Sequence, residues 1–152
     1  MRISHRVTTP AEPDEVWAVL EDPSRWPEWD LFLRRVEGGR GRIREGQHLM
    51  VTVRGLPVRV PVDVRMVATG RRLGLTVHTA PGLREQVDHD VTRRPRGGSQ
   101  VRVSTVLEGP FAPLAVVPLW CASALNTWML GWRATREHRR VHGTRGSRPG
   151  AA

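Results

Sequence analysis

The residues best suited to acid–base chemistry lie on one predicted strand. Over residues 83–92, His89 and Glu85 share a face with Val87 and Val91. A histidine can act as an acid or a base near neutral pH, and Glu85, four residues away, could orient His89. We therefore predict His89 and Glu85 as catalytic residues. The structural alternative is that His89 is a hydrogen-bonded histidine of the core or its rim, and that Glu85, close to a turn, reaches solvent.

Polar side chains on two further strands share faces with apolar residues. His5 lies between Ile3 and Val7 on the first strand, and Thr105 lies on the apolar face of the last strand. A later helix adds hydroxyl, thiol and amide groups: Cys121, Ser123, Asn126 and Thr127. We predict that His5, Thr105 and Cys121 contact a ligand, although Cys121 also suits the role of a small buried hydrophobe.

Tryptophans form the second candidate group. The chain has 6 Trp and 0 Tyr. We assign Trp17 to the core. The other five could line a pocket for a flat or greasy ligand, with plain core packing equally expected for each: Trp26, Trp29, Trp120, Trp128 and Trp132. The predicted ligand-binding set takes four of them and one leucine: Trp26, Trp29, Leu125, Trp128 and Trp132.

These side chains need elements to position them, and the longest is a helix near the C-terminus. Residues 111–132 contain no charged side chain. Pro118 suits the first helical position, where its missing N–H costs nothing, so we predict a helix from Pro118 to Arg140. We expect this helix to be buried on most sides by a curved sheet. Its apolar stripe, at 100° per residue, consists of Cys121, Ala124, Leu125, Trp128 and Trp132.

A membrane is the alternative partner for this helix, because about 20 apolar residues span the hydrocarbon core of a bilayer. The prolines and the polar residues Ser123, Asn126 and Thr127 argue against a spanning helix. We therefore do not expect membrane insertion. A membrane-tethered protein is the weakest of the functional alternatives.

Seven segments have the alternation of apolar and polar residues that is typical of strands. They are residues 2–8, 31–36, 48–54, 58–66, 73–79, 83–92 and 101–108. Two short helical segments follow the first strand, the first from Glu12 to Leu20 and the second within residues 24–30. Tight turns between consecutive strands favour an antiparallel sheet, and its apolar face needs the long helix as a cover. The sequence thus predicts an α+β fold, with a curved seven-stranded antiparallel sheet around the C-terminal helix.

The composition indicates one domain that needs no cofactor. A chain of 152 residues is long enough for a real core, and we assign residues 1–142 to a ligand-binding domain and residues 143–152 to a disordered basic tail. The lone cysteine and the lack of a signal-peptide pattern predict a cytoplasmic protein. The sequence has no glycine-rich phosphate loop, no Gly-x-Ser-x-Gly elbow and no Cys-x-x-Cys pair, so we expect no cofactor.

The net charge of +9 does not by itself indicate nucleic-acid binding. All 24 basic residues are arginines spread over nearly every segment, whereas a nucleic-acid site gathers them on one element with a recognisable motif. His138 and His142 have the i, i+4 spacing of a metal-binding pair on a helix, but Glu137 is the only acid close to them in the sequence. We expect both histidines to face solvent, and we predict neither a nucleic-acid partner nor a metal.

The N-terminal pattern resembles that of a known superfamily. A first strand precedes a short helix with Val16-Trp17, the pair Asp22-Pro23, and Trp29 just before the second strand. This order is similar to the START/Bet v 1-like (SRPBCC) superfamily, in particular to its polyketide cyclase/dehydrase group. A glycine before the third strand and the final long helix fit as well, so the resemblance covers about residues 2–140.

The resemblance implies a helix-grip fold with a ligand cavity between sheet and helix. It is less specific for function, because the superfamily includes cyclases, aromatases, lipid carriers and hormone receptors that share no universal catalytic motif. By resemblance we expect the chain to bind a hydrophobic small molecule and to promote aldol-type cyclisation and dehydration of a polyketide-like substrate, with His89 moving protons. The alternative is a non-catalytic carrier of a lipid or an aromatic metabolite. The absence of tyrosine argues against an aromatase mechanism that depends on a phenol.

The two functions differ in what the cavity should contain. Acid–base catalysis requires His89 and a second polar group, His5 or Thr105, within hydrogen-bond reach in the same space. A cavity lined only by apolar side chains favours a carrier. We predict no particular oligomeric state.

Overall fold

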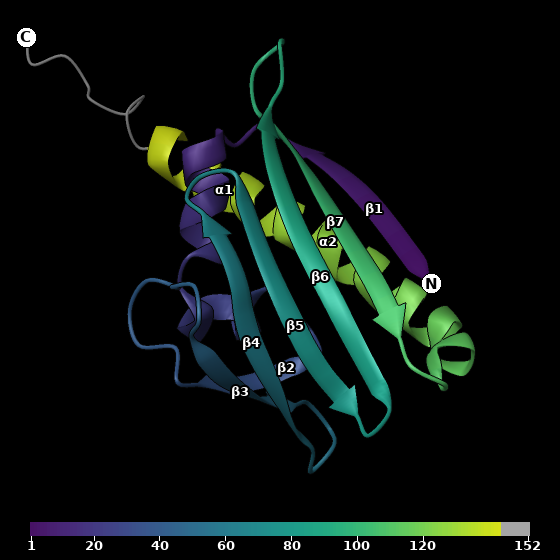
Figure 1. Ribbon diagram of the computed structural model, residues 1–152. Coiled ribbons are helices and arrows are strands. Elements are labelled where there is room, and N and C mark those ends of the chain that lie inside the picture. Colours follow the sequence, from purple (N-terminus) through teal and green to yellow (C-terminus); the bar gives the residue numbers. More distant parts are fainter. Residues whose placement is uncertain (144–152) are drawn as a thin grey trace, which may run out of the picture.

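Seven strands form one antiparallel sheet in the computed structural model, which describes residues 1–143 (Figure 1). The strands are β1 (Arg2–Thr9), β2 (Leu33–Glu37), β3 (His48–Val53), β4 (Arg59–Ala68), β5 (Arg72–Ala80), β6 (Leu83–Arg93) and β7 (Ser99–Glu108). Their order in the sheet is β1-β7-β6-β5-β4-β3-β2. Alternation places the apolar side chains on one face, as on β4, where Val60, Val62 and Val64 are buried. The predicted seven-stranded antiparallel sheet is confirmed.

Two short helices follow β1, and one long helix follows β7. They are α1 (Pro13–Leu20), the 3-10 helix η1 (Pro23–Glu28) and α2 (Ala112–Gly143). α1 begins with a capping box, in which the Glu15 carboxylate accepts the N–H of Glu12 at 2.8 Å. Val16 and Trp17 of α1 are buried in the main core, as expected for Trp17. The predicted succession of strand, two short helices, six strands and long helix is confirmed.

The start of α2 differs from the prediction. The helix begins at Ala112, so Pro118 lies inside it and not at its first position. Proline cannot donate the hydrogen bond that the carbonyl of Leu114, four residues earlier, would otherwise accept. Leu114 is 80% exposed, so this turn of the helix lies at the protein surface. The helix continues through the proline.

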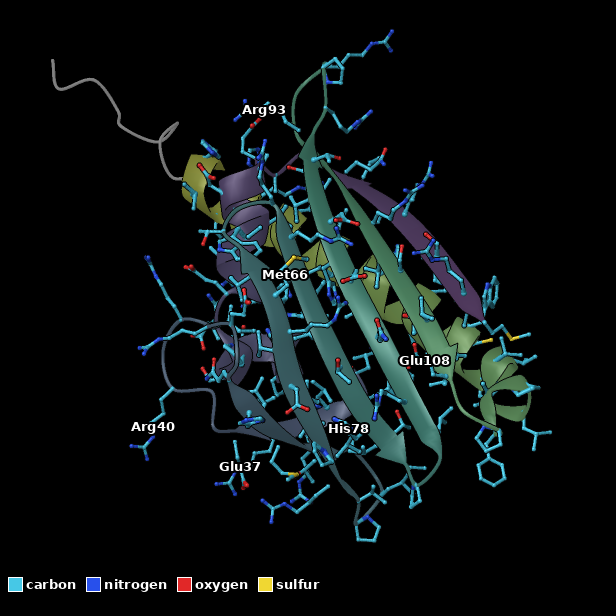
Figure 2. All side chains as sticks on the ribbon, in the orientation of Figure 1. Glu37, Arg40, Met66, His78, Arg93 and Glu108 are labelled. Atoms are coloured by element: carbon cyan, nitrogen blue, oxygen red, sulfur yellow. The ribbon has the colours of Figure 1, made fainter. Side chains whose placement is uncertain are left out.

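α2 packs across the apolar face of the sheet, and α1 lies beside the C-terminal end of α2 (Figure 1). A glycine allows a close approach of α2 to β1: a Cβ at Gly131 would lie 2.7 Å from the Cγ2 atom of Val7. The opposite face of the sheet is polar. The labelled side chains His78 and Glu108 extend from it on the side away from α2 (Figure 2).

The C-terminal end of α2 lies at the boundary of the described chain. Gly143, which we predicted to begin a disordered tail, is the last residue of α2, and residues 144–152 of that predicted tail lie outside the described residues. By length and composition α2 could cross a membrane, and only 17% of its most apolar window is buried. Much of the helix surface therefore faces outward.

Candidate ligand-binding cavity

A cavity of about 560 Å³ lies between the inner face of the sheet and α2. Side chains from η1, β2 to β7 and α2 line it, and most of them are apolar, such as Val62, Leu75 and Leu130. The sheet side follows directly from strand alternation, because the residues that point inward on β4, β5 and β6 point into this space. Trp26 and Trp29 close one wall, and the Trp26 indole is fixed by donating its Nε1–H to the carbonyl of Leu20 at 2.9 Å.

His89 is the most deeply buried ionisable side chain of the cavity wall. It is 8% exposed, and its Nδ1 atom has no hydrogen-bond partner among the described residues. Burial lowers the pKa of His89 to about 4, although the charge of Asp88 and a backbone hydrogen bond at Leu73 oppose the shift. The imidazole is therefore neutral at neutral pH.

Glu85 also lines the cavity, but it does not contact His89 as we had predicted. The Thr79 hydroxyl donates a hydrogen bond to the Glu85 carboxylate. Four residues along a strand span about 13 Å, which is too far for a hydrogen bond between Glu85 and His89. Burial raises the pKa of Glu85, and the bond from Thr79 only partly opposes this. The prediction that Glu85 orients His89 is therefore wrong. The two side chains are separate polar groups on one wall of the cavity.

A second carboxylate in the cavity was missed by the sequence analysis. Asp30 follows η1, accepts the N–H of Phe32 at 2.9 Å, and is hydrogen bonded to Asn126 of α2. Burial raises the pKa of Asp30, while the hydrogen bonds from Phe32, Asn126 and Leu33 and the charge of Arg54 oppose the shift. Strand or helix periodicity could not have indicated Asp30, because it lies in an irregular segment. Its position directly after Trp29, in a stretch with two tryptophans, was the only local signal.

The side of α2 that faces the cavity is not the predicted one. Its cavity-lining residues include Ala122, Ser123, Asn126, Thr127 and Leu130. The predicted ligand contacts on α2 are all exposed and do not line the cavity: Cys121, Leu125, Trp128 and Trp132. The assumption that the most apolar stripe faces inward was wrong, because the helix turns a mixed face of apolar, small and polar side chains toward the sheet. This correction removes these four residues from the candidate site.

Most of the predicted site residues outside α2 do line the cavity. Trp26, Trp29 and Thr105 line the cavity together with His89. His5 does not, because β1 is an edge strand next to α2 and the His5 ring packs against the Trp120 ring, with 5.3 Å between centroids. Thr105 is opposite Val87 in the register of β6 and β7. Thr105 and His89 line the same cavity, as acid–base catalysis would require, and no hydrogen bond joins the two side chains in the described chain.

A family model agrees with this architecture. It is described as polyketide cyclase / dehydrase and lipid transport, and it matches residues 1–141. The chain belongs to this family. Among curated proteins, none matches the chain.

Solved structures share the Bet v 1-like (SRPBCC) fold of this family member. MLL2253 from Mesorhizobium loti has a TM-score of 0.69 and 16% identity over 92% of this chain and 98% of that protein. DynU16, from the dynemicin biosynthetic locus, has a TM-score of 0.68 and 21% identity over 93% of this chain and 48% of that protein. Ara h 8.0201 has a TM-score of 0.61 and 14% identity over 86% of this chain and 97% of that protein. At these identities the similarity establishes the fold.

The cavity of this family member is suited to an apolar molecule with a few polar atoms. The walls carry separate polar groups: His89, the pair of Glu85 and Thr79, and the pair of Asp30 and Asn126. The Ser123 hydroxyl adds another donor, since it has no hydrogen-bond partner within residues 1–143. Three metal-ligating atoms come together in the described chain outside this cavity, on α1 and α2.

Proposed function

We propose that the protein binds a hydrophobic small molecule in the cavity between the sheet and α2. The observation that supports this proposal is the cavity itself, which has a volume of about 560 Å³, apolar walls and only isolated polar groups. Sites for small molecules have this character: a largely apolar surface buries the ligand, and a few polar atoms orient it.

The polar points suggest where the oxygen atoms of such a ligand would bind. A carbonyl or hydroxyl near His89 would form a hydrogen bond with Nδ1, which has no partner among the described residues. A second oxygen could accept a hydrogen bond from the Ser123 hydroxyl on the opposite wall. Polyketide-like chains and lipids both combine a long apolar body with oxygen atoms, and the family description names both classes.

Acid–base catalysis on a polyketide-like substrate is the second candidate function. The neutral imidazole of His89 could take a proton from a carbon next to a carbonyl group, so that the resulting enolate attacks a second carbonyl and closes a ring. The imidazolium would return the proton to the new alkoxide, and loss of water from the resulting alcohol would follow. The lowered pKa of His89 makes it a weak base, and no second polar side chain of the described chain is hydrogen bonded to it. These two observations favour binding over catalysis.

The test uses two alanines of α2 that differ in position. Ala122 lines the cavity and Ala124 does not, while both are half-buried. We expect full-length protein to bind a long-chain fatty acid or an aromatic polyketide, measured by quenching of tryptophan fluorescence. Ala122→Phe should fill part of the cavity and weaken this binding at least tenfold, whereas Ala124→Phe should leave it unchanged. Equal effects of the two substitutions, with circular dichroism showing both variants folded, would contradict binding in this cavity.

Native mass spectrometry separates the two candidate functions. A fatty acid or phospholipid that co-purifies unchanged supports a carrier. A polyketide-like compound that the protein converts into a cyclised, dehydrated product supports an enzyme. In that case His89→Gln should abolish turnover while the variant still binds the compound.

A further inference from the structure

Two helices bring a carboxylate and two imidazoles together at the end of the molecule where α1 meets α2 (Figure 1). Glu15 belongs to the first turn of α1, and His138 and His142 belong to the last turns of α2. One ligand atom from each lies within 4.8 Å of the other two, and in residues 1–143 no other three histidine, cysteine or acidic side chains come as close. Glu15 and His138 are separated by 123 positions in the sequence.

The contacts give these side chains a geometry close to that of metal ligands. His138 Nδ1 lies 2.7 Å from one Glu15 oxygen, and His142 Nε2 lies 3.3 Å from the other. In a tetrahedral Zn²⁺ site, bonds of about 2.1 Å place neighbouring ligand atoms about 3.4 Å apart. Side-chain shifts of the order of 1 Å would therefore complete such a site. The i, i+4 spacing of His138 and His142 is the spacing with which one helix face presents two histidines to zinc.

The carboxylate is ionised and held in place. Burial alone would raise the pKa of Glu15, but the backbone N–H of Glu12 and the imidazole of His138 lower it below its ordinary value. The hydrogen bond from Glu12 to Glu15 Oε2 orients the carboxylate, as outer-shell contacts do in metal sites. The His142 side chain is 49% exposed, so an ion can reach the group from solvent.

We propose that Glu15, His138 and His142 form a binding site for a divalent transition metal of the zinc class. The site is separate from the ligand cavity, and its ion would fasten the last turns of α2 to α1. Three protein ligands leave the fourth position to water. Two imidazoles and one carboxylate favour Zn²⁺, Ni²⁺ or Cu²⁺, whereas Mg²⁺ prefers oxygen ligands and water.

A second group of the same residue types provides the control. On the outer face of the sheet, His48 and His78 contact opposite oxygens of Asp63 at 2.6 and 2.8 Å. Their three ligand atoms are not within 4.8 Å of one another, since the described chain has only the Glu15 group at that distance. Contact of a carboxylate with two histidines is thus common to both groups, and within residues 1–143 only the Glu15 group has the compactness of a metal site.

The experiment is isothermal titration of full-length, tag-free, chelator-treated protein with Zn²⁺ at pH 7.5, with Mg²⁺ as a second probe. We expect one Zn²⁺ per chain, no Mg²⁺ binding, and a melting temperature that rises with Zn²⁺. His142→Gln and His138→Gln should each weaken Zn²⁺ binding at least about tenfold, while His48→Gln should have no effect. Absence of 1:1 Zn²⁺ binding, or an equal loss in His48→Gln, would overturn the proposal.

Discussion

Large apolar side chains lie on both faces of α2, unlike in most amphipathic helices. The face toward the cavity includes Ser123, Asn126 and Thr127, and the outer face includes Trp128 at 58% exposure and Trp132 at 42%. An amphipathic helix of a globular protein usually buries its apolar stripe. The inner face of α2 instead covers a cavity whose apolar surface comes mainly from the sheet.

The difference shows that hydrophobicity alone does not orient this helix. Small and polar residues on the inner face leave room for the cavity, and Gly131 allows α2 to approach β1 at Val7. Large side chains on the inner face would fill that space. The same contrast between the two faces should appear in stability measurements.

The largest expected effect on α2 is at its inner face. Leu130 is fully buried and Leu125 is 39% exposed on the same helix. Leu130→Ala should lower the free energy of unfolding by about 2–5 kcal/mol, because it removes buried methyl groups and leaves a void. Leu125→Ala should lower it by less than about 1 kcal/mol. Urea denaturation measures both, and equal losses would contradict the assignment of the two faces.

The pH dependence of stability should reveal the histidine of the cavity wall. The pKa of His89 falls from its ordinary value of 6.5 to about 4 in the folded protein, so the unfolded chain binds the proton more tightly. Stability should fall as the pH decreases from about 6.5 to about 4, with a contribution from His89 of about 3 kcal/mol. The raised pKa values of Glu85 and Asp30 act in the opposite direction.

A comparison of variants isolates this contribution. His89→Gln should reduce the loss of stability between pH 6.5 and pH 4, measured by urea denaturation at each pH. His48→Gln, on the outer face of the sheet, should retain most of the wild-type dependence. An unchanged pH profile in His89→Gln would show that His89 is not buried in its neutral form.

A pair of glycines tests the close approach of α2 to β1. A Cβ at Gly131 would lie 2.7 and 2.9 Å from the methyl carbons of Val7, whereas a Cβ at Gly143 would meet no atom within 4 Å. Gly131→Ala should destabilise the protein by roughly 1 kcal/mol, because overpacking outweighs the better helix propensity of alanine. Gly143→Ala should not lower the melting temperature. A stabilising Gly131→Ala would indicate a wider separation of α2 from β1.

The smallest expected effect is at the outer face. Trp128→Gln should change the free energy of unfolding by at most about 0.5 kcal/mol, because the side chain is mostly exposed. Trp29→Ala should cost about 3–5 kcal/mol, since Trp29 is 5% exposed in the core. Thermal or urea denaturation of the two variants provides the comparison. A large loss in Trp128→Gln would mean that this tryptophan is buried in solution.

Local sequence patterns predicted the fold and the sheet side of the cavity. Period-two alternation assigns each strand residue to one of two faces, and so His89, Glu85 and Thr105 were correctly placed among the inward residues. The turns between consecutive strands then favoured an antiparallel sheet, and only the C-terminal segment was long enough to cover it. Each of these inferences depends on neighbours within a few residues.

Contacts between distant segments decided the rest. The rotation of α2 about its axis depends on how closely Gly131 approaches Val7, and the first turns of α2 are too uniformly apolar for periodicity to indicate it. The pairing of Asp30 with Asn126 joins an irregular segment to a helix, and Glu15 meets His138 only because α1 packs against the end of α2. Periodicity describes the faces of one element, whereas these contacts depend on the relative placement of two.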